Sequence, residues 1–512
     1  MRSPPVFPPR RTLSAALLAL ALLAALGAAP PATAQARADT LAAVHLLQRA
    51  TFGVRQADVA ALLREGRAAW LERQLSPDGI PNDGLAARLA AHPAAGMSVA
   101  ELYRAFPPAQ PARLVAELAG ARLQRAVYGE RQLEEVMTDF WFNHFNVFAG
   151  KAAVRWLVAD YERTAIRPHV FGRFEELLRA TARHPAMLLY LDNARSVAID
   201  SSAPAYRRRQ PRPEGPRRTP GLNENYGREL LELHTLGVDG GYTQQDVIEV
   251  ARAFTGWTVA RPGRDAGAGP GFVFRPELHD RGAKTVLGRA LPAGRGEQDG
   301  LDVLHLLATH PATARHLARK LVQRFVADEP RPRLEAELVR VFLASDGGLR
   351  EVTRTLFSAP EFHAAENRGA KLKTPFELVA SALRATDAEV GDARGVLQTL
   401  RTLGQVPYAA SAPTGYPATS EEWTNGGAML ARMNFALALA AGRLPGVRLP
   451  PLQAPGATPE ARVHALARRV LPAAPTAELE RRVLADVANA PGGASDVRAL
   501  GLLLGSPEFQ KK

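Results

Sequence analysis

A broad apolar stripe along residues 130–148 is the feature that most restricts how this chain can fold. Apolar side chains recur there at steps of three and four residues, which is the spacing of one face of an α-helix. The stripe consists, in order, of Leu133, Val136, Met137, Phe140, Trp141, His144, Phe145 and Phe148. A helix with so wide an apolar face has to pack inside a core. The sequence therefore predicts a large helical fold arranged around this segment.

Helical spacing extends along most of the chain, whereas strand signals are few. A first helix is expected to begin at Thr40, a residue type that caps helices, and to run until Gly53. Short strands are indicated at 272–274 and 284–288, on either side of a loop that holds His279-Asp280. The expected fold class is therefore mainly α, a large multi-helix globular fold with at most a small β-hairpin.

The composition excludes several classes of protein. Of the 512 residues, 46% are hydrophobic and 22% are charged, which excludes general disorder and a collagen-like fibre. The chain has no cysteine, so a thiol nucleophile, thiolate zinc sites and disulfide bonds are also excluded. A globular protein of about two to three domains remains as the expectation from length.

The N-terminus indicates export. Arg10 and Arg11 precede an apolar run from Leu13 to about Ala29, and the small residues Ala32-Thr33-Ala34 follow. This order is typical of a signal peptide covering residues 1–34, cleaved so that the mature chain begins near Gln35. The protein is therefore expected in the periplasm or medium, by the Sec or the twin-arginine route. No later segment is long and apolar enough to span a membrane, so no stable span is expected after cleavage.

Composition shifts indicate how the mature chain is divided. Residues 35–443 are expected to form the main helical domain, a Pro-rich linker should cover 444–459, and a helical segment should cover 460–512. Within the main domain, residues 205–220 hold six arginines and one glutamate and are predicted to form a mobile loop. Basic and aromatic residues are not interleaved there, so no nucleic-acid partner is expected.

Two segments carry lines of polar side chains that chemistry could use. Read as an α-helix, residues 223–237 place Asn225, Glu229 and Glu232 along one side, where Arg228 can pair with acids at i±4. Paired carboxylates can serve as acid and base, although a buried polar network that fixes helix packing explains the same residues. The predicted catalytic residues are Glu229, Glu232, His144 and Asp139, and the predicted substrate-binding residues are Asn143, Asn223, Asn225, Arg228, Trp257, His279 and Asp280.

The two polar lines are expected to meet at one site. If the helices pack through their apolar stripes, Asp139, Asn143 or His144 should lie within about 10 Å of Asn225 or Glu229. Trp257 and the His279-Asp280 loop are expected to form walls. The same nitrogen and oxygen groups could hold a divalent metal ion, but the HExxH spacing of zinc hydrolases is absent, so the cofactor stays unknown.

Residues 223–257, NENYGRELLELHTLGVDGGYTQQDVIEVARAFTGW, resemble the signature of a bacterial family catalogued as domain of unknown function 1800. Further patterns of that family match at 45–53 (HLLQRATFG), 139–147 (DFWFNHFNV), 185–193, 279–288, 319–326 and 404–435. The resemblance implies an exported protein, often encoded beside a second exported family that looks like a sulfatase or alkaline phosphatase. It implies no activity, and no catalytic residue is carried over.

Two classes of function stay open. The first is an extracytoplasmic, hydrolase-like enzyme that acts on a polar or polymeric substrate. The second is a non-catalytic helical binding or scaffold protein that works with the exported sulfatase-like partner. A deep polar cleft with a perturbed carboxylate would favour the enzyme, and a broad apolar surface patch would favour the scaffold.

Overall fold

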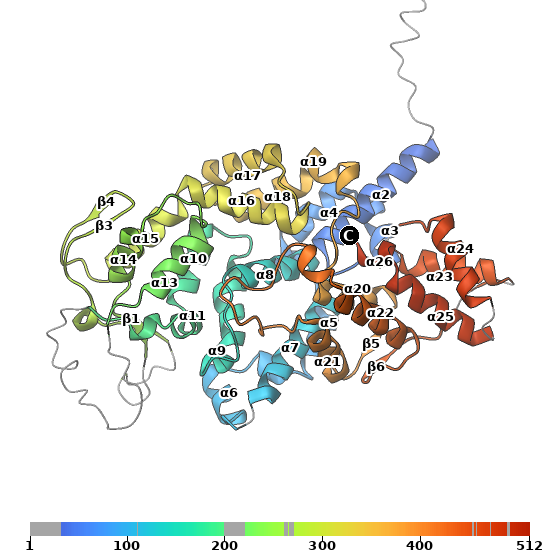
Figure 1. Cartoon of the computed structure of the whole chain (residues 1–512), viewed down its shortest axis with the longest axis horizontal. Coiled ribbons are helices and arrows are strands. Elements are labelled where there is room, and N and C mark those ends of the chain that lie inside the picture. Colours follow the sequence, from blue (N-terminus) through green and yellow to red (C-terminus); the bar gives the residue numbers. More distant parts are fainter. Residues whose placement is uncertain are drawn as a thin grey trace, which may run out of the picture. The chain divides into compact units, whose positions relative to one another are not determined.

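Helices form nearly all of the regular structure in the part of the chain that the computed structural model describes (Figure 1). The mainly α fold class is therefore confirmed. The described residues are 32–109, 111–198, 221–260, 265, 271–452, 455–456, 458–471, 473–488 and 492–512. The predicted arginine loop, 205–220, lies outside them, and so does the predicted signal peptide, apart from its last three residues.

The first half of the described chain contains short and medium helices. They are α2 (Ala32–Ala50), α3 (Gln56–Glu65), α4 (Arg67–Gln74), α5 (Asp83–Leu89), α6 (Val99–Ala105), α7 (Pro111–Tyr128), α8 (Gln132–His144), α9 (Val154–Tyr161), α10 (Phe174–Arg183), α11 (Pro185–Tyr190), α13 (Glu224–Glu229) and α14 (Gln244–Ala253). Two π-helical segments, η3 (Glu162–Ile166) and η6 (Leu230–Thr235), continue α9 and α13.

The second half is helical in the same way. Its helices are α15 (Gln298–Ala308), α16 (Pro311–Phe325), α17 (Pro332–Ala344), α18 (Leu349–Ser358), α19 (Pro360–His363), α20 (Pro375–Ala385), α21 (Arg394–Leu403), α22 (Gly426–Ala440), α23 (Pro459–Val470), α24 (Ala477–Val487), α25 (Gly492–Gly505) and α26 (Pro507–Gln510). Single 3-10 turns occur along the whole chain, at Pro77–Gly79, Pro93–Ala95, Arg167–His169, Asn193–Arg195, Pro276–Leu278, Ala365–Asn367 and Glu421–Trp423. None of the described helices is long and apolar enough to cross a membrane.

Helix α8 confirms the apolar stripe that the sequence shows. Trp141 and Phe145 are completely buried, and the ring of Trp141 lies 5.9 Å from that of Phe174 on α10. On another side of α8, the ring of Phe140 lies 5.8 Å from that of Phe325 on α16. Because it touches helices from both halves of the chain, α8 can bring residues distant in sequence to one site.

The first helix begins earlier than predicted. Helix α2 starts at Ala32, and the hydroxyl of Thr40 donates to the carbonyl of Ala36 at 2.8 Å within the helix instead of capping its end. Gly53, where the helix was expected to stop, packs closely against Ser381. Its φ is +140°, and a Cβ atom there would lie 2.5 Å from Ser381. Glycine is the residue that this close approach requires.

The predicted strands form, but the hairpin between them is wrong. Strand β2 (Phe272–Phe274) pairs with β1 (Trp257–Val259), and β3 (Lys284–Val286) pairs with β4 (Arg289–Leu291). The second pair is closed by Leu287 and Gly288, both with positive φ, which is the geometry of the tight turn preferred in two-residue hairpins. Each of the two expected strands therefore pairs with a third or fourth strand, and they do not pair with each other.

The residues expected to form a linker contain a short strand. Strand β6 (Val447–Arg448) pairs with β5 (Glu389–Val390), and α23 and α24 beyond it pack on α25, which itself packs on α22. Residues 43–512 form one compact unit by their contacts. The domain boundaries stay a prediction.

Candidate functional site

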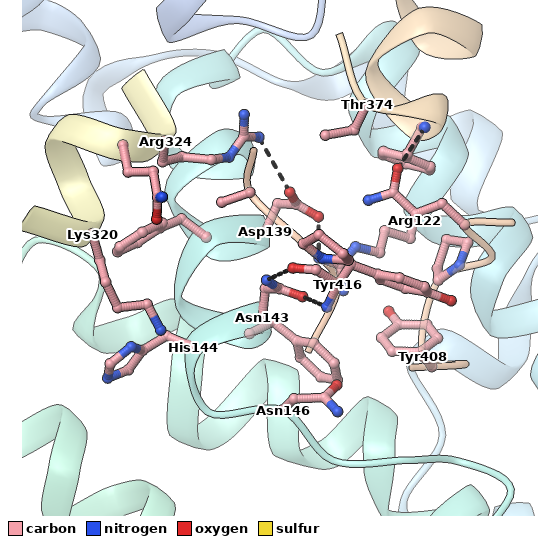
Figure 2. Close-up of a pocket in the computed structure, with 18 residues that line it drawn as sticks. Arg122, Asp139, Asn143, His144, Asn146, Lys320, Arg324, Thr374, Tyr408 and Tyr416 are labelled. Carbon is pink, nitrogen blue, oxygen red and sulfur yellow. Dashed lines mark hydrogen bonds and ion pairs between the residues drawn. The ribbon is translucent and has the colours of Figure 1, made fainter. Parts of the chain in front are cut away.

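A cavity of about 70 Å³ opens beside α8 and is lined by residues from several helices and one loop (Figure 2). Its lining consists of Arg122, Asp139, Phe140, Phe142, Asn143, His144, Asn146, Lys320, Gln323, Arg324, Thr374, Phe376, Gln405, Pro407, Tyr408, Tyr416, Pro417 and Ala418. Three of the predicted site residues, Asp139, Asn143 and His144, line this cavity. The lining also holds three cationic side chains and only one carboxylate.

Asp139 lies between two arginines from different helices. Its Oδ1 atom is 2.8 Å from Nη2 of Arg122 on α7, and its Oδ2 atom is 3.4 Å from Nη2 of Arg324 on α16. Figure 2 shows the carboxylate between the two guanidinium groups. Asp139 therefore orients these arginines, and the catalytic role predicted for it stays a prediction.

A second carboxylate fixes Arg122 from behind. Glu162, the first residue of the π-helix η3, accepts from Nη1 of Arg122 at 3.0 Å and from the hydroxyl of Tyr408 at 2.9 Å. Burial alone would raise the pKa of Glu162, but the neighbouring arginines Arg122 and Arg167 reverse this effect and hold that pKa below its usual value. The guanidinium of Arg122 is thus held by two carboxylates and lies 5.0 Å from the ring centre of Phe142.

Asn143 and Asn146 bind the loop 405–418, part of which lines the cavity. The amide of Asn143 donates to the carbonyl of Tyr416 at 2.9 Å and accepts from its N–H at 2.7 Å. Asn146 donates to the carbonyls of Ala410 and Ala412 at 3.0 and 2.8 Å. Both hydrogen-bonding groups of the Asn143 amide therefore bind backbone, and its predicted substrate-binding role stays a prediction.

Three neutral histidines surround one wall of the cavity. Nε2 of His144 lies 3.1 Å from the carbonyl oxygen of His234, so this nitrogen must carry the proton and donate. His316 donates in the same way to the carbonyl of Leu233 at 3.2 Å. Burial, followed by the charge of Lys320, lowers the pKa of His234 to about 3 and that of His316 to about 4, and lowers the pKa of His144 strongly. All three are uncharged at neutral pH.

Lys320 is the lining charge that stands alone. Its side chain runs beside His144 toward the cavity (Figure 2) and is partly buried. It makes no hydrogen bond or ion pair with any residue that the structure describes, whereas Arg122, Asp139 and Arg324 are all paired. Burial lowers the pKa of Lys320 to about 8.

The second predicted polar line lies outside the cavity lining. The two segments contact each other where His144 of α8 meets His234 of η6. The distance predicted for Asn225 or Glu229 stays a prediction. The chain switches from α-helix to π-helix at Leu230, so Glu232 no longer follows the α-helical spacing from Asn225 and Glu229.

The polar residues of this second line have partners of their own. Arg228 pairs with Glu224 at 3.6 Å, as expected, and Glu232 accepts from the hydroxyl of Tyr242 at 3.2 Å. Asn223 caps α13 by accepting from the N–H of Asn225 at 2.9 Å. These side chains stabilise the helix and its junctions.

Glu229 is the exception in this line. It has no hydrogen bond or ion pair with a described residue, and burial together with the nearby charge of Glu232 raises its pKa. Its charge also helps to raise the pKa of Tyr190. The hydroxyl of Tyr190 donates to the carbonyl of Ser411 in the loop 405–418. Glu229 is therefore close to the site without lining it.

Trp257, His279 and Asp280 form a separate cluster. Nε2 of His279 lies 3.3 Å from Asp299, which also binds the ammonium group of Lys284 at 2.8 Å. Asp280 pairs with Arg252 at 2.9 Å, and Trp257 is completely buried. These groups connect α14 and α15 to the short strands. They do not line the cavity beside α8, and the role predicted for them stays a prediction.

The described residues contain no group of three or more His, Asp or Glu side chains that could hold a metal ion. His144 and His234 are near each other, but Nε2 of His144 is taken by a carbonyl group. The cofactor therefore stays unknown.

Comparison with known proteins gives one match. The model of the family described as protein of unknown function (DUF1800) matches residues 45–511. The chain belongs to this family. No curated protein and no solved structure matches it.

The family match covers the whole of the cavity lining. Residues 45–511 include α8, α16 and the loop 405–418, so every residue that lines the cavity lies within the family match. Lys320 and Arg324 were absent from the predicted site residues. A run of basic residues on α16, Arg315, Arg319, Lys320 and Arg324, looks in sequence like a solvated helix face.

Proposed function

We propose that this protein acts outside the cytoplasm and binds an anionic group of a polar ligand in the cavity beside Lys320. The observation that carries the proposal is the lone ammonium group of Lys320, which faces a cavity whose other charges are paired. The location rests on the signal-like residues 1–34. N-terminal sequencing of the exported form tests that part, and Gln35 is the expected first residue.

The physical argument is the cost of an uncompensated charge. A cation that is withdrawn from water without a partner destabilises the folded state, and proteins usually pair such groups or use them to bind ligands. A carboxylate, phosphate or sulfate group of a ligand would supply the missing partner. The adjacent Arg122 and Arg324 are already fixed by Asp139, so they add positive potential without needing to reorganise.

The size of the cavity limits what can enter. A single water needs roughly 10–15 Å³ of such volume, so a cavity of about 70 Å³ admits a small charged group with a few waters. The body of a larger ligand, for example a polymer, would stay outside. The proposal therefore concerns the acidic group of the ligand.

Calorimetric titration with sulfate, inorganic phosphate and acetate tests the proposal. Lys320→Met should weaken binding of at least one of these anions tenfold or more, and Lys320→Arg, which keeps the charge, should retain most of it. Arg64→Gln removes an exposed charge on α3 that does not line the cavity, and it is the matched control. Equal affinity of wild type and Lys320→Met for all three anions would overturn the proposal.

A second candidate function is hydrolase-like catalysis, and Glu229 is the observation that favours it. A half-buried carboxyl group with a raised pKa and no partner among the described residues is suited to hold and release a proton. Glu229→Gln keeps the shape and removes the acid, so an enzyme should lose turnover while its melting temperature stays near that of wild type. If the protein instead has a non-catalytic role, it should bind the sulfatase-like partner in a pull-down. Glu229→Gln should then leave that binding unchanged.

A further inference from the structure

A second cavity lies behind Arg122 and is lined mainly by arginines. Its volume is about 60 Å³, and its lining consists of Ala95, Leu118, Ala121, Arg122, Arg125, Ala159, Glu162, Arg163, Arg167 and Tyr408. Four guanidinium groups and one carboxylate thus face one small space with alanine and leucine walls. Apolar walls strengthen the field of the charges, because they keep water away from them.

The π-helix η3 is what gathers these charges. The N–H of Arg167 donates to the carbonyl of Glu162, five residues earlier, so the two residues stack one turn apart on the same side. Their side chains form an ion pair at 3.2 Å, and Arg122 from α7 binds the other oxygen of Glu162 at 3.0 Å. The one carboxylate in the lining is therefore fully used by two arginines.

Most of the arginines also have carboxylates outside the cavity. Arg167 pairs with Glu135 at 2.8 Å, and Arg163 pairs with Asp160 at 2.7 Å. Arg125 is different. It is partly buried, and its guanidinium group makes no hydrogen bond or ion pair in the described part of the chain, although its charge helps to lower the pKa of Glu162.

We propose that this arginine-lined cavity is a second anion site, which binds a small tetrahedral oxyanion of the phosphate or sulfate class through Arg125. A guanidinium group presents a planar fork of N–H donors that matches two oxygens of such an anion. The lone fork of Arg125, beside three arginines that are already held in place, is a preorganised receptor for one oxyanion. This site does not depend on the function proposed above.

The two cavities share Arg122 and Tyr408, so their occupancies should influence each other. This coupling, unlike the site itself, rests on the proposed function. An anion at Arg125 would partly neutralise the positive potential of Arg122. It would also repel a second anion in the first cavity, beside Lys320. The coupling is therefore negative, and it is reciprocal because each ligand must change the affinity of the other by the same factor.

Calorimetric titration with inorganic phosphate tests the site, at about 0.15 M salt to screen loosely bound ions. Wild type should bind two anions per chain. Arg125→Gln should lose one of them and Lys320→Met the other, while the control Arg64→Gln keeps both. Arg125→Lys retains the charge without the fork and should bind at an affinity between wild type and Arg125→Gln.

The outcomes separate the two proposals. If Arg125→Gln binds phosphate as wild type does, the arginine site is overturned, whatever Lys320→Met shows. If only Lys320→Met is unchanged, the function proposed for the first cavity fails and the arginine site stands. Phenyl phosphate in place of phosphate distinguishes the source of the bound oxyanion. If the ester binds as tightly as phosphate, the site accepts a phosphorylated ligand. If the ester does not bind, the site takes the free ion.

Discussion

Oδ1 of Asp139 lies 2.8 Å from Nη2 of Arg122, and this ion pair decides which group in the first cavity is free to act. Because Arg324 contacts the other oxygen of the same carboxylate, Asp139 holds both arginines in place. Its role is to position them, and the charge left for a ligand is that of Lys320. The same pairing makes Asp139 a test of the architecture around the cavity.

Asp139→Asn is expected to destabilise the fold. The substitution removes the charge from two ion pairs, and a hydrogen bond to a charged group contributes ~1.5–3 kcal/mol, so the free energy of unfolding should fall by about 2 kcal/mol. Urea unfolding measures the loss. Asp78→Asn is the control, because Asp78 is fully exposed and its pair with Arg131 at 3.5 Å should contribute little. Equal stability of the two variants would mean that Asp139 does not fix the arginines.

Anion binding in the first cavity should weaken at alkaline pH. Burial sets the pKa of Lys320 at about 8 in the free protein, and only the ammonium form attracts an anion. Affinity should therefore be nearly constant below pH 7 and fall by up to tenfold per unit above pH 8. Lys320→Arg, whose charge persists, should bind with little pH dependence over the same range. A wild-type affinity that stays flat to pH 10 would contradict the role given to Lys320.

The histidine cluster should make the protein acid-sensitive. In the folded chain the pKa of His234 is about 3 and that of His316 about 4, both below the value of about 6.5 for an unfolded chain. Between these values the unfolded state binds more protons, so stability is full above pH 6.5 and is lost as the pH falls. Each histidine contributes a slope of ~1.4 kcal/mol per pH unit. In denaturant titrations from pH 7 to 4, His316→Gln should show a shallower slope than wild type.

Gly415 should be intolerant of substitution. Its φ is +74°, and a Cβ atom would lie 2.5 Å from the backbone oxygen of Asn143 on α8. Gly415→Ala is therefore expected to detach the loop and lower the melting temperature by several degrees, through strain of about 1–3 kcal/mol. Gly79→Ala, at a position with open space around it, is the control. Unchanged proteolysis of the loop 405–418 in Gly415→Ala would show that the loop tolerates the added carbon.

The sequence could predict the parts of the site that depend on local patterns. The apolar stripe of α8 follows from spacing and is confirmed. The polar line from Asn225 to Glu232 was read on an α-helix, but the π-helix from Leu230 changes its spacing. No residue pattern in that segment indicates the switch from α-helix to π-helix.

The long-range pairings that isolate Lys320 could not be predicted. Arg324 is held by Asp139, which is 185 residues away, and by Glu377 on α20. Only the folded arrangement shows that these partners satisfy Arg324 and leave Lys320 without one. The same holds for Arg125, which in sequence is one more basic residue on α7.

Titration of Lys320 by NMR tests directly whether this side chain is the cation that binds an anion in the first cavity. The chain has only seven lysines, so selective 13C labelling gives few signals, and Lys320→Arg assigns the relevant one. We expect a pKa of about 8 for Lys320 in the free protein and a higher pKa when sulfate or phosphate is added, because a bound anion favours the charged form. An ordinary lysine pKa that does not change with either anion would contradict this role of Lys320.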